Sequence, residues 1–284
     1  MTLRYSKRTT SMNSLDYFSD VATDYAEYRP SYPASAIDTM LEGFQQPSTL
    51  AAADIGAGTG IGSRLLAQRG IRVQAIEPNA DMRSAAIPHQ NIEWIAGSAE
   101  QLPLLTSSID LVVSFQAFHW FEFGQSLREF QRILKPTGRL ALLWNFWNQA
   151  DSFSHRYTHI LYEVAKRYNS PAVQPQSGCP NVNDTRLTDW VKRRQYGLFW
   201  QGIYLPHFKQ LDRRQFMYQQ TLDRAGLIGC ALSQGFLPRS GAGVEDLCDR
   251  LDRLYADWKD KQGRVRLVYQ TYLYTAAPVA KQAE

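Results

Sequence analysis

The chain has 284 residues, of which 44% are hydrophobic and 20% are charged, and its formal net charge is +4. This composition is typical of a folded globular protein and excludes a fibrous or largely disordered chain. The length suits one domain that carries an insertion, so we treat residues 1–284 as a single domain. The Lys and Arg residues are scattered along the chain, which does not favour a nucleic-acid partner.

Hydropathy and cysteine usage limit the cellular setting. No apolar run approaches the roughly 18 residues of a membrane helix, and the N-terminal segment lacks the apolar stretch of a signal sequence. Cys179, Cys230 and Cys248 are far apart and form no CxxC pair, so we expect no metal site. We expect a cytoplasmic protein that does not act at a membrane.

Residues 50–145 alternate between short β-like runs and helical stretches. We expect strands at 50–55, 71–76, 92–95, 109–115 and 139–144, helices at 61–68, 80–87 and 123–134, and a turn at 135–138. The run at 109–115 is apolar on both faces, as in a central strand of a parallel sheet. The alternation predicts an α/β fold with a doubly wound, mostly parallel sheet.

The alternation stops near residue 146. Residues 146–206 are rich in aromatic and polar residues and include a loop with several prolines, which indicates a cap inserted into the sheet fold. Two long strands are expected at 208–221 and 265–275, around a helix at 244–259. They bring the expected sheet to seven strands.

A glycine-rich loop, ADIGAGTGIG at residues 53–62, follows the first expected strand. Such a loop between a strand and a helix lets a ligand approach the backbone closely. The dinucleotide pattern GxGxxG or GxGxxA does not fit, because Ile61 or Ser63 occupies its last position. A phosphate loop of the GxxxxGK type does not fit either, because no Lys follows the glycines.

An acidic residue followed by GxGxG resembles the first motif of the class I S-adenosylmethionine-dependent methyltransferases, which have a Rossmann-like fold. The resemblance implies S-adenosylmethionine as the cofactor, with Asp54 near its ammonium group. It also implies that the loop backbone lies against the carboxylate and the ribose of the cofactor, at Gly56, Ala57, Gly58 and Gly60.

The end of the second expected strand carries Glu77, where a carboxylate can accept both ribose hydroxyls. NAD enzymes also place an acid there, so Glu77 indicates a cofactor with a ribose but does not identify that cofactor as a methyl donor. By the resemblance, Pro78 and Met82 flank the adenine. Met82 could equally be a core residue.

The segment GSAEQLP at 97–103 looks like the family's GDAxxLP element, which holds the adenine. Ser98 replaces the usual Asp, which weakens the acceptor for the adenine amino group to a hydroxyl. Ser98, Ala99 and Glu100 are the cofactor contacts implied here. The segment could also be an ordinary loop.

Two later segments, DLVVSFQAFHW at 110–120 and RILKPTG at 132–138, look like the family's fourth strand and the turn that precedes its fifth. The first of them implies cofactor contacts at Phe115 and Gln116. Residues 18–33 resemble a narrower group, the trans-aconitate-methyltransferase-like enzymes of the methyltransferase type 11 group. In that group an N-terminal helix folds over the cofactor, so residues 1–45 are expected to form a lid with Tyr25 and Arg29 near the cofactor carboxylate.

His119 follows the fourth expected strand, at the sheet edge where open α/β sheets hold their active sites. It is the candidate catalytic base, and a structural role beside Trp120 is the alternative. Aromatic residues gather near it in the sequence and suggest an apolar or planar acceptor below the cap at 146–206. The residues expected to bind the acceptor are Phe118, His119, Trp120, Trp144 and Trp147, with Phe121 and Phe146 nearby.

The sequence therefore predicts methyl transfer from S-adenosylmethionine to a small molecule, either a carboxylic acid or a secondary metabolite. Whether oxygen, nitrogen or carbon is methylated stays open, as does the choice between a monomer and a homodimer. The alternatives are an inactive methyltransferase-like binding protein and an NAD-linked oxidoreductase. Nucleic-acid methylation is disfavoured, since the chain has no dense basic segment and no NPPY-like motif.

Overall fold

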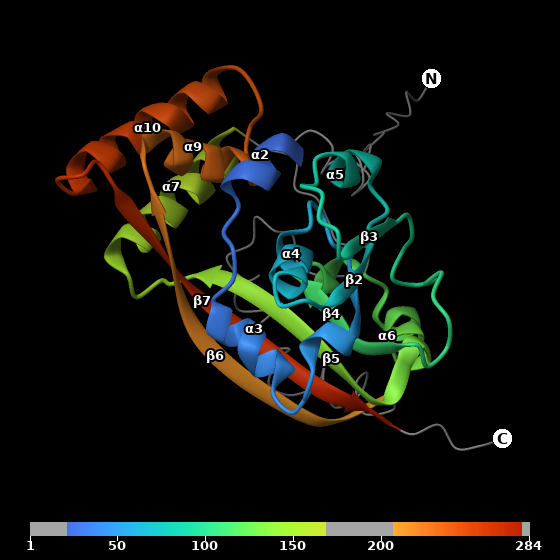
Figure 1. Cartoon of the computed structure of the whole chain (residues 1–284). Helices are drawn as coiled ribbons and strands as arrows, with labels where there is room; N and C mark the ends of the chain where they lie inside the picture. The colour runs from blue at the N-terminus through green and yellow to red at the C-terminus, as the bar shows by residue number, and fades with distance from the viewer. Residues whose placement is uncertain (1–21, 169–206, 280–284) are drawn as a thin grey trace, which may run out of the picture.

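The computed structural model describes residues 22–168 and 207–279. Its centre is a seven-stranded sheet in the order β3-β2-β1-β4-β5-β7-β6 (Figure 1). The strands are β1 (Ala51–Ile55), β2 (Arg72–Ile76), β3 (Ile92–Ile95), β4 (Ile109–Phe115), β5 (Leu134–Trp147), β6 (Phe208–Leu222) and β7 (Val265–Pro278). β1 to β5 pair in parallel, whereas β7 is antiparallel to β5 and to β6. The predicted doubly wound, mostly parallel sheet of seven strands is confirmed.

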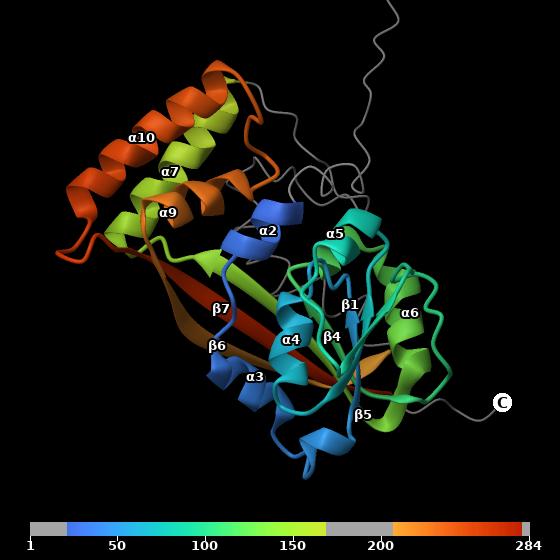
Figure 2. The same ribbon diagram turned by 45° about the horizontal axis from the view of Figure 1, so that its top comes forward.

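Helices cover both faces of this sheet. They are α2 (Ala22–Tyr28), α3 (Ala34–Leu41), α4 (Ile61–Ala67), α5 (Ala80–Ser84), α6 (Phe123–Ile133), α7 (Ser152–Arg167), α9 (Arg224–Leu232) and α10 (Ala242–Trp258), with short 3-10 turns at Pro47–Thr49 and Phe118–Trp120. Figure 2 shows α3 and α4 on one side of the parallel strands and α6 on the other.

Alternating side chains of the strands build two hydrophobic cores. On β5, Leu140 and Leu142 point to the face covered by α6, where Phe130 is fully buried. Ala141 and Leu143 point to the opposite face and join the core under α3 and α4. Because successive residues of a strand face opposite sides, a strand buried on both faces has a continuous apolar run, which is why the central strands could be predicted well.

β5 is longer than the sequence indicates. Leu134 pairs with Ile109 and Arg139 pairs with Leu111, so the expected turn at 135–138 is an irregular bulge within the strand, opposite Asp110. Lys135 lies in this bulge, and its Nζ makes an ion pair of 2.8 Å with Asp110. At its other end β5 runs to Trp147, beyond the expected cap boundary at 146, because residues 140–147 pair with β7.

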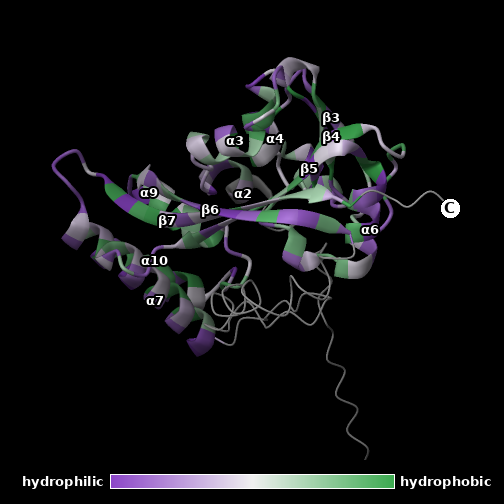
Figure 3. Ribbon diagram, turned by 90° about the horizontal axis from the view of Figure 1, so that it is seen from below, coloured by the Kyte–Doolittle hydropathy of each residue, from purple (hydrophilic) through white to green (hydrophobic). Residues whose placement is uncertain are grey.

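The long strands β6 and β7 carry a separate helical group at one end. α7, α9 and α10 gather there in Figures 1 and 2, and Leu161, Leu227 and Leu251 are fully buried in the core that they share with β7. β6 is an edge strand with mostly exposed side chains, in agreement with its hydrophilic stretches in Figure 3. Residues 169–206 of the expected cap and 1–21 of the expected lid lie outside the described residues. Within the described part, no helix combines the length and the apolar character needed to cross a membrane.

Gly62 provides a test of the packing between α4 and β4. A Cβ at Gly62 would lie 2.1 Å from Cδ2 of Phe115, so Gly62→Ala must displace the ring or the helix. We expect this overpacking to lower the free energy of unfolding by about 1–3 kcal/mol. Urea unfolding would measure it.

Gly124→Ala is the matched control, since Gly124 also lies in the first turn of a helix. Its Cβ would lie no closer than 3.4 Å to Glu122, an ordinary contact. We expect this variant to be unchanged or up to about 1 kcal/mol more stable, because alanine is the better helix former. Equal unfolding midpoints for the two variants would show that the contact between α4 and Phe115 is looser than described.

Candidate functional site

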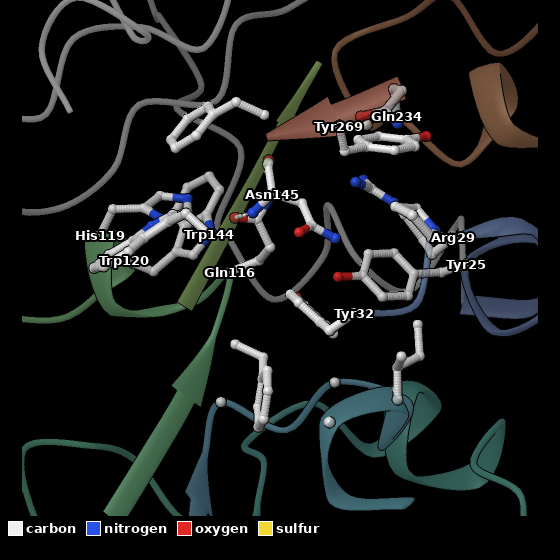
Figure 4. Close-up of a pocket in the computed structure, with 18 of the residues that line it drawn as sticks. Tyr25, Arg29, Tyr32, Gln116, His119, Trp120, Trp144, Asn145, Gln234 and Tyr269 are labelled. Carbon is white, nitrogen blue, oxygen red and sulfur yellow. Dashed lines mark hydrogen bonds between the residues drawn. The ribbon is translucent and has the colours of Figure 1, made fainter. Parts of the chain in front are cut away.

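A cavity of about 170 Å³ lies at the carboxyl ends of β1, β4 and β5. Its walls come from residues 25–32, the glycine loop after β1, the ends of β4 and β5, Tyr162 of α7, the loop at 234–236 and Tyr269 of β7. Figure 4 shows His119, Trp120 and Trp144 on one side of the cavity and Tyr25, Arg29 and Tyr269 on the other. Ligands bind at this edge of open α/β sheets.

The glycine loop is tied to the end of β2. The backbone N–H groups of Gly56 and Ala57 both donate to the carbonyl oxygen of Ile76, at 2.9 and 3.1 Å. The loop backbone has a φ of +58° at Gly58, a conformation that L residues rarely adopt. A Cβ at Gly58 would meet only Cε1 of Tyr25, at 3.9 Å, so the space above it belongs to the cavity.

Glu77 follows β2 and is 8% exposed. Its Oε2 accepts a hydrogen bond of 2.8 Å from the Gly58 N–H, and its Oε1 accepts one of 2.9 Å from the Asn79 N–H. Burial raises the pKa of the Glu77 carboxyl, and these two bonds offset part of the rise. The carboxylate thus lies against the glycine loop, although it does not line the cavity.

Asp54 is the last residue but one of β1 and is fully buried. Its Oδ2 accepts a hydrogen bond of 2.6 Å from the Ser63 hydroxyl, whereas Oδ1 has no hydrogen-bond partner among the described residues. Burial raises the pKa of Asp54 to about 7, against the hydrogen bond from Ser63, and the nearby Glu77 adds to the rise. A partner that donates hydrogen bonds or carries positive charge would favour the ionised form of this carboxyl.

Arg29 lies across the cavity from the aromatic group, just after α2. Its guanidinium stacks on the Tyr25 ring at 4.5 Å and donates a 2.9 Å hydrogen bond to the Ser233 carbonyl. Its Nε is buried without a hydrogen-bond partner, and Arg29 forms no ion pair within the described residues. Tyr32 lies within electrostatic range of both Arg29 and Asp54, and burial raises its hydroxyl pKa well above the ordinary value.

The residues expected around the adenine do not line this cavity, and neither does Asp54. Met82 is 1% exposed and packs against Tyr25, so it is part of a small core. Ala99 is also buried, and Ser98 forms an isolated bridge with Gln101. Glu100 accepts a 2.9 Å hydrogen bond from the Glu122 N–H, at the start of α6. Pro78 and Gly60 likewise lie outside the cavity wall, and the ring of Trp94 covers Gly60.

Gln116 and Asn145 join the ends of β4 and β5 inside the cavity. The Gln116 amide donates to the Asn145 carbonyl and accepts from the Asn145 N–H, both at 3.1 Å. Gln116 has a φ of +55°, and such a conformation in a residue other than glycine is typical of functional sites. The Asn145 amide donates to the Ser31 carbonyl at 2.9 Å and accepts from the Thr271 hydroxyl. These bonds hold the N-terminal segment on the sheet.

Four of the residues expected to bind the acceptor line the cavity: His119, Trp120, Trp144 and Trp147. Phe118 does not, because the 3-10 turn directs it into the core, where it is 1% exposed. Its ring lies 5.1 Å from that of Phe123 and 6.1 Å from that of Phe130.

His119 is held by Trp144, whose indole Nε1 donates a 3.3 Å hydrogen bond to Nδ1 of the imidazole. Burial lowers the pKa of His119 to about 4, so the ring is neutral at neutral pH. This low pKa argues against the expected role of His119 as a base, since such an imidazole takes up protons poorly.

Several wall residues were not predicted from the sequence. Tyr32, Tyr162, Gln234, Phe236 and Tyr269 come from the N-terminal segment, α7, the loop after α9, and β7. No short motif marks them. The one available signal is the aromatic enrichment of α7 and β7, which does not distinguish cavity walls from core. The described residues include no group of three or more His, Cys, Asp or Glu side chains that could hold a metal ion.

Comparison with known proteins gives matches to methyltransferases. Residues 53–142 match a methyltransferase domain. An uncharacterized methyltransferase of Mycobacterium bovis is 37% identical over 143 residues, which span 49% of this chain and 55% of that protein. A Dictyostelium discoideum protein that is named as a methyltransferase is 29% identical, over 89% of this chain and 90% of its own.

A solved structure from Anaeromyxobacter dehalogenans, described as a type II methyltransferase, shares the fold of this chain. The TM-score is 0.64 at 18% identity, over 88% of this chain and 98% of that one. The match to the Mycobacterium bovis relative spans only about half of its length. The match to the methyltransferase domain covers the end of β1, all of β2, β3 and β4, and most of β5, and it includes the glycine loop.

The buried carboxyl of Asp54 makes a testable contribution to the pH dependence of stability. Its pKa of about 7 lies above the ordinary value of 3.8, so the folded state holds a proton that the unfolded state has lost between these values. The contribution of this group to the free energy of unfolding is therefore fully present below pH 3.8, and it falls by roughly 1.4 kcal/mol per pH unit until pH 7. Asp54→Asn should remove this pH dependence. The stability of the variant relative to that of the wild type should therefore rise by on the order of 2–3 kcal/mol between pH 5 and pH 8.

Urea unfolding at both pH values would measure this difference. Asp38→Asn is the control, since it removes an exposed carboxylate that pairs with Arg69 on the surface. We expect it to shift stability by no more than about 1 kcal/mol at either pH. A wild type and an Asp54→Asn variant that run parallel from pH 5 to pH 8 would contradict the raised pKa.

Proposed function

We propose that this protein transfers a methyl group from S-adenosylmethionine to a small-molecule acceptor, as in the trans-aconitate-methyltransferase-like group. The observation that carries the proposal is an acidic and a basic side chain on either side of the glycine loop, Asp54 and Arg29. Each has a buried polar atom without a hydrogen-bond partner among the described residues.

These residues fit the cofactor. Its methionine end has an ammonium group and a carboxylate, and each would meet its opposite charge, the ammonium at Asp54 and the carboxylate at Arg29. The ionised form of Asp54 that burial disfavours would be stabilised by the ammonium. The open space above Gly58 accommodates a ligand that a side chain there would displace.

The ribose would lie between the glycine loop and Glu77, whose two oxygens can accept its hydroxyls. Glu77 already contacts the loop through the Gly58 N–H. The adenine would lie beyond the wall of this cavity, and its contacts with Pro78, Met82, Ser98, Ala99 and Glu100 stay part of the proposal.

The bound cofactor would supply an electrophilic methyl group. The chain's own residues would hold the acceptor next to it, since orientation provides most of the rate in such a displacement. Trp120, Trp144 and Trp147 form apolar walls that exclude water and stack on a planar molecule. Gln116 and Asn145 keep the ends of β4 and β5 in fixed register around it.

Thermal unfolding in the presence of S-adenosylmethionine, S-adenosylhomocysteine or NAD tests the cofactor. A ligand at about 100 times its dissociation constant adds about 2.7 kcal/mol, which should raise the unfolding midpoint by roughly 5–10 °C. We expect a rise with the two sulfur compounds and none with NAD. A rise with NAD alone would support an oxidoreductase. No rise with any of the three compounds would support the inactive binding protein, an alternative that Ser98 in place of the usual Asp favours.

Gly58→Ala tests the position of the cofactor. The added Cβ would enter the cavity, so we expect the thermal shift with S-adenosylhomocysteine to be lost. Gly43→Ala is the matched control, because Gly43 also has a positive φ, +87°, and its Cβ would lie 3.8 Å from Arg139. Both variants should lose about 1 kcal/mol of stability from backbone strain. Only Gly58→Ala should lose the ligand; an unchanged shift in this variant would contradict the placement.

A further inference from the structure

The amide of Gln234, in the loop after α9, is held by the protein at one end only. The side chain is 5% exposed and lines the cavity. Its Nε2 donates a 3.3 Å hydrogen bond to the Cys230 carbonyl, whereas its Oε1 accepts none within the described part of the chain. A carbonyl oxygen can only accept, so the amide nitrogen must be the end that faces Cys230. Since Oε1 is not sealed in the core, Gln234 presents a hydrogen-bond acceptor at the cavity.

The backbone around Gln234 fixes this orientation. The Gln234 N–H donates to the Ala231 carbonyl at 2.9 Å, and the Gln234 carbonyl accepts from the Leu237 N–H at 3.2 Å. The residue before it, Ser233, has its carbonyl bound by the Arg29 guanidinium at 2.9 Å. The amide could turn only by breaking its bond to the helix end, so its oxygen keeps a defined place in the wall.

Aromatic rings form much of the same wall. Phe236 stacks on Tyr162 of α7, with ring centroids 5.6 Å apart and planes only 13° from parallel. Figure 4 shows Gln234 beside Tyr269, whose hydroxyl is already engaged, because it donates a 2.9 Å hydrogen bond to Gln220. The ring of Tyr269 is thus what it offers to a ligand. A flat molecule fits against such rings and can direct a polar edge to the oxygen of Gln234.

We propose that Gln234 is a specificity-determining residue, whose Oε1 accepts a hydrogen bond from a neutral O–H or N–H group of a planar aromatic molecule that receives the methyl group. The inference rests on the proposed function and deepens it, because it names the kind of molecule that is methylated. A carboxylate is ionised at neutral pH and has no proton to donate to this oxygen. An ammonium group has protons to donate, but the positive charge of Arg29 in the same wall would repel it. A neutral donor is the group that fits.

Calorimetric binding to the protein saturated with S-adenosylhomocysteine tests this selection. The probes are indole and benzofuran, two flat bicyclic molecules of nearly equal size, of which only indole carries a ring N–H. We expect indole to bind about 3- to 10-fold more tightly than benzofuran, which is the usual contribution of one neutral hydrogen bond.

Gln234→Leu removes the oxygen and keeps the size of the side chain. The Cys230 carbonyl loses one donor but keeps the Ser233 hydroxyl at 2.7 Å, so we expect a folded variant. It should bind indole no more tightly than benzofuran, while benzofuran and S-adenosylhomocysteine stay within about 2-fold of their wild-type affinities. Gln219→Leu is the matched control, because Gln219 is exposed on the edge strand β6 and does not line the cavity. It should keep the wild-type preference for indole.

The inference is overturned if the wild type binds benzofuran as tightly as indole, or if it binds neither probe at millimolar concentration. Both results come from the wild type, so they do not depend on the folding of a variant. It is also overturned if Gln234→Leu keeps the preference for indole, or if the variant weakens S-adenosylhomocysteine as much as indole, since Gln234 would then contact the cofactor. Failure of the proposed function looks different, because S-adenosylhomocysteine itself would produce no binding signal with the wild type.

Discussion

The attachment of the glycine loop to the end of β2 is the constraint on which the site depends. Two consecutive N–H groups, of Gly56 and Ala57, share the Ile76 carbonyl, and the Gly58 N–H binds the Glu77 carboxylate. The loop therefore turns sharply over the sheet edge without a side chain above it. This turn starts α4 at Ile61, where Gly62 fits against Phe115, and it leaves Asp54 buried beneath. The floor of the cavity, the packing of α4 and the position of Glu77 follow from these few bonds.

Much of this part of the fold could be predicted because its signals are local. Each central strand is a short apolar run that ends at a turn, and the sequence places β3 and β4 at the observed bounds. The length of β5 could not be predicted in the same way. Pro136 and Gly138 read as a turn, yet the chain absorbs them in a bulge, and the extension to Trp147 depends on pairing with Tyr269, more than a hundred residues later. Pairing over such a distance leaves no mark in a local pattern.

The same difference between local signals and contacts of distant residues applies to the candidate site. Asp54, the loop glycines and Glu77 belong to one strand-turn-helix unit and its neighbour, so a motif could identify them. Gln234 and Tyr269 reach the cavity only because the helices beyond β6 and the strand β7 fold back beside it. Phe118 shows the opposite limit: an aromatic residue beside His119 in sequence is turned into the core by a single 3-10 turn.

Asn145 links the two sides of the cavity. Its backbone holds Gln116 at the end of β4, and its side chain holds Ser31 in the segment that carries Arg29 and Tyr32. The next residue before it on β5 is Trp144, which orients His119. The wall proposed for the cofactor carboxylate and the wall proposed for the acceptor are thus built on adjacent residues of one strand end. A ligand that orders either wall also restrains the other, because a shift of this strand end would have to break the hydrogen bonds of Asn145 and Gln116 together.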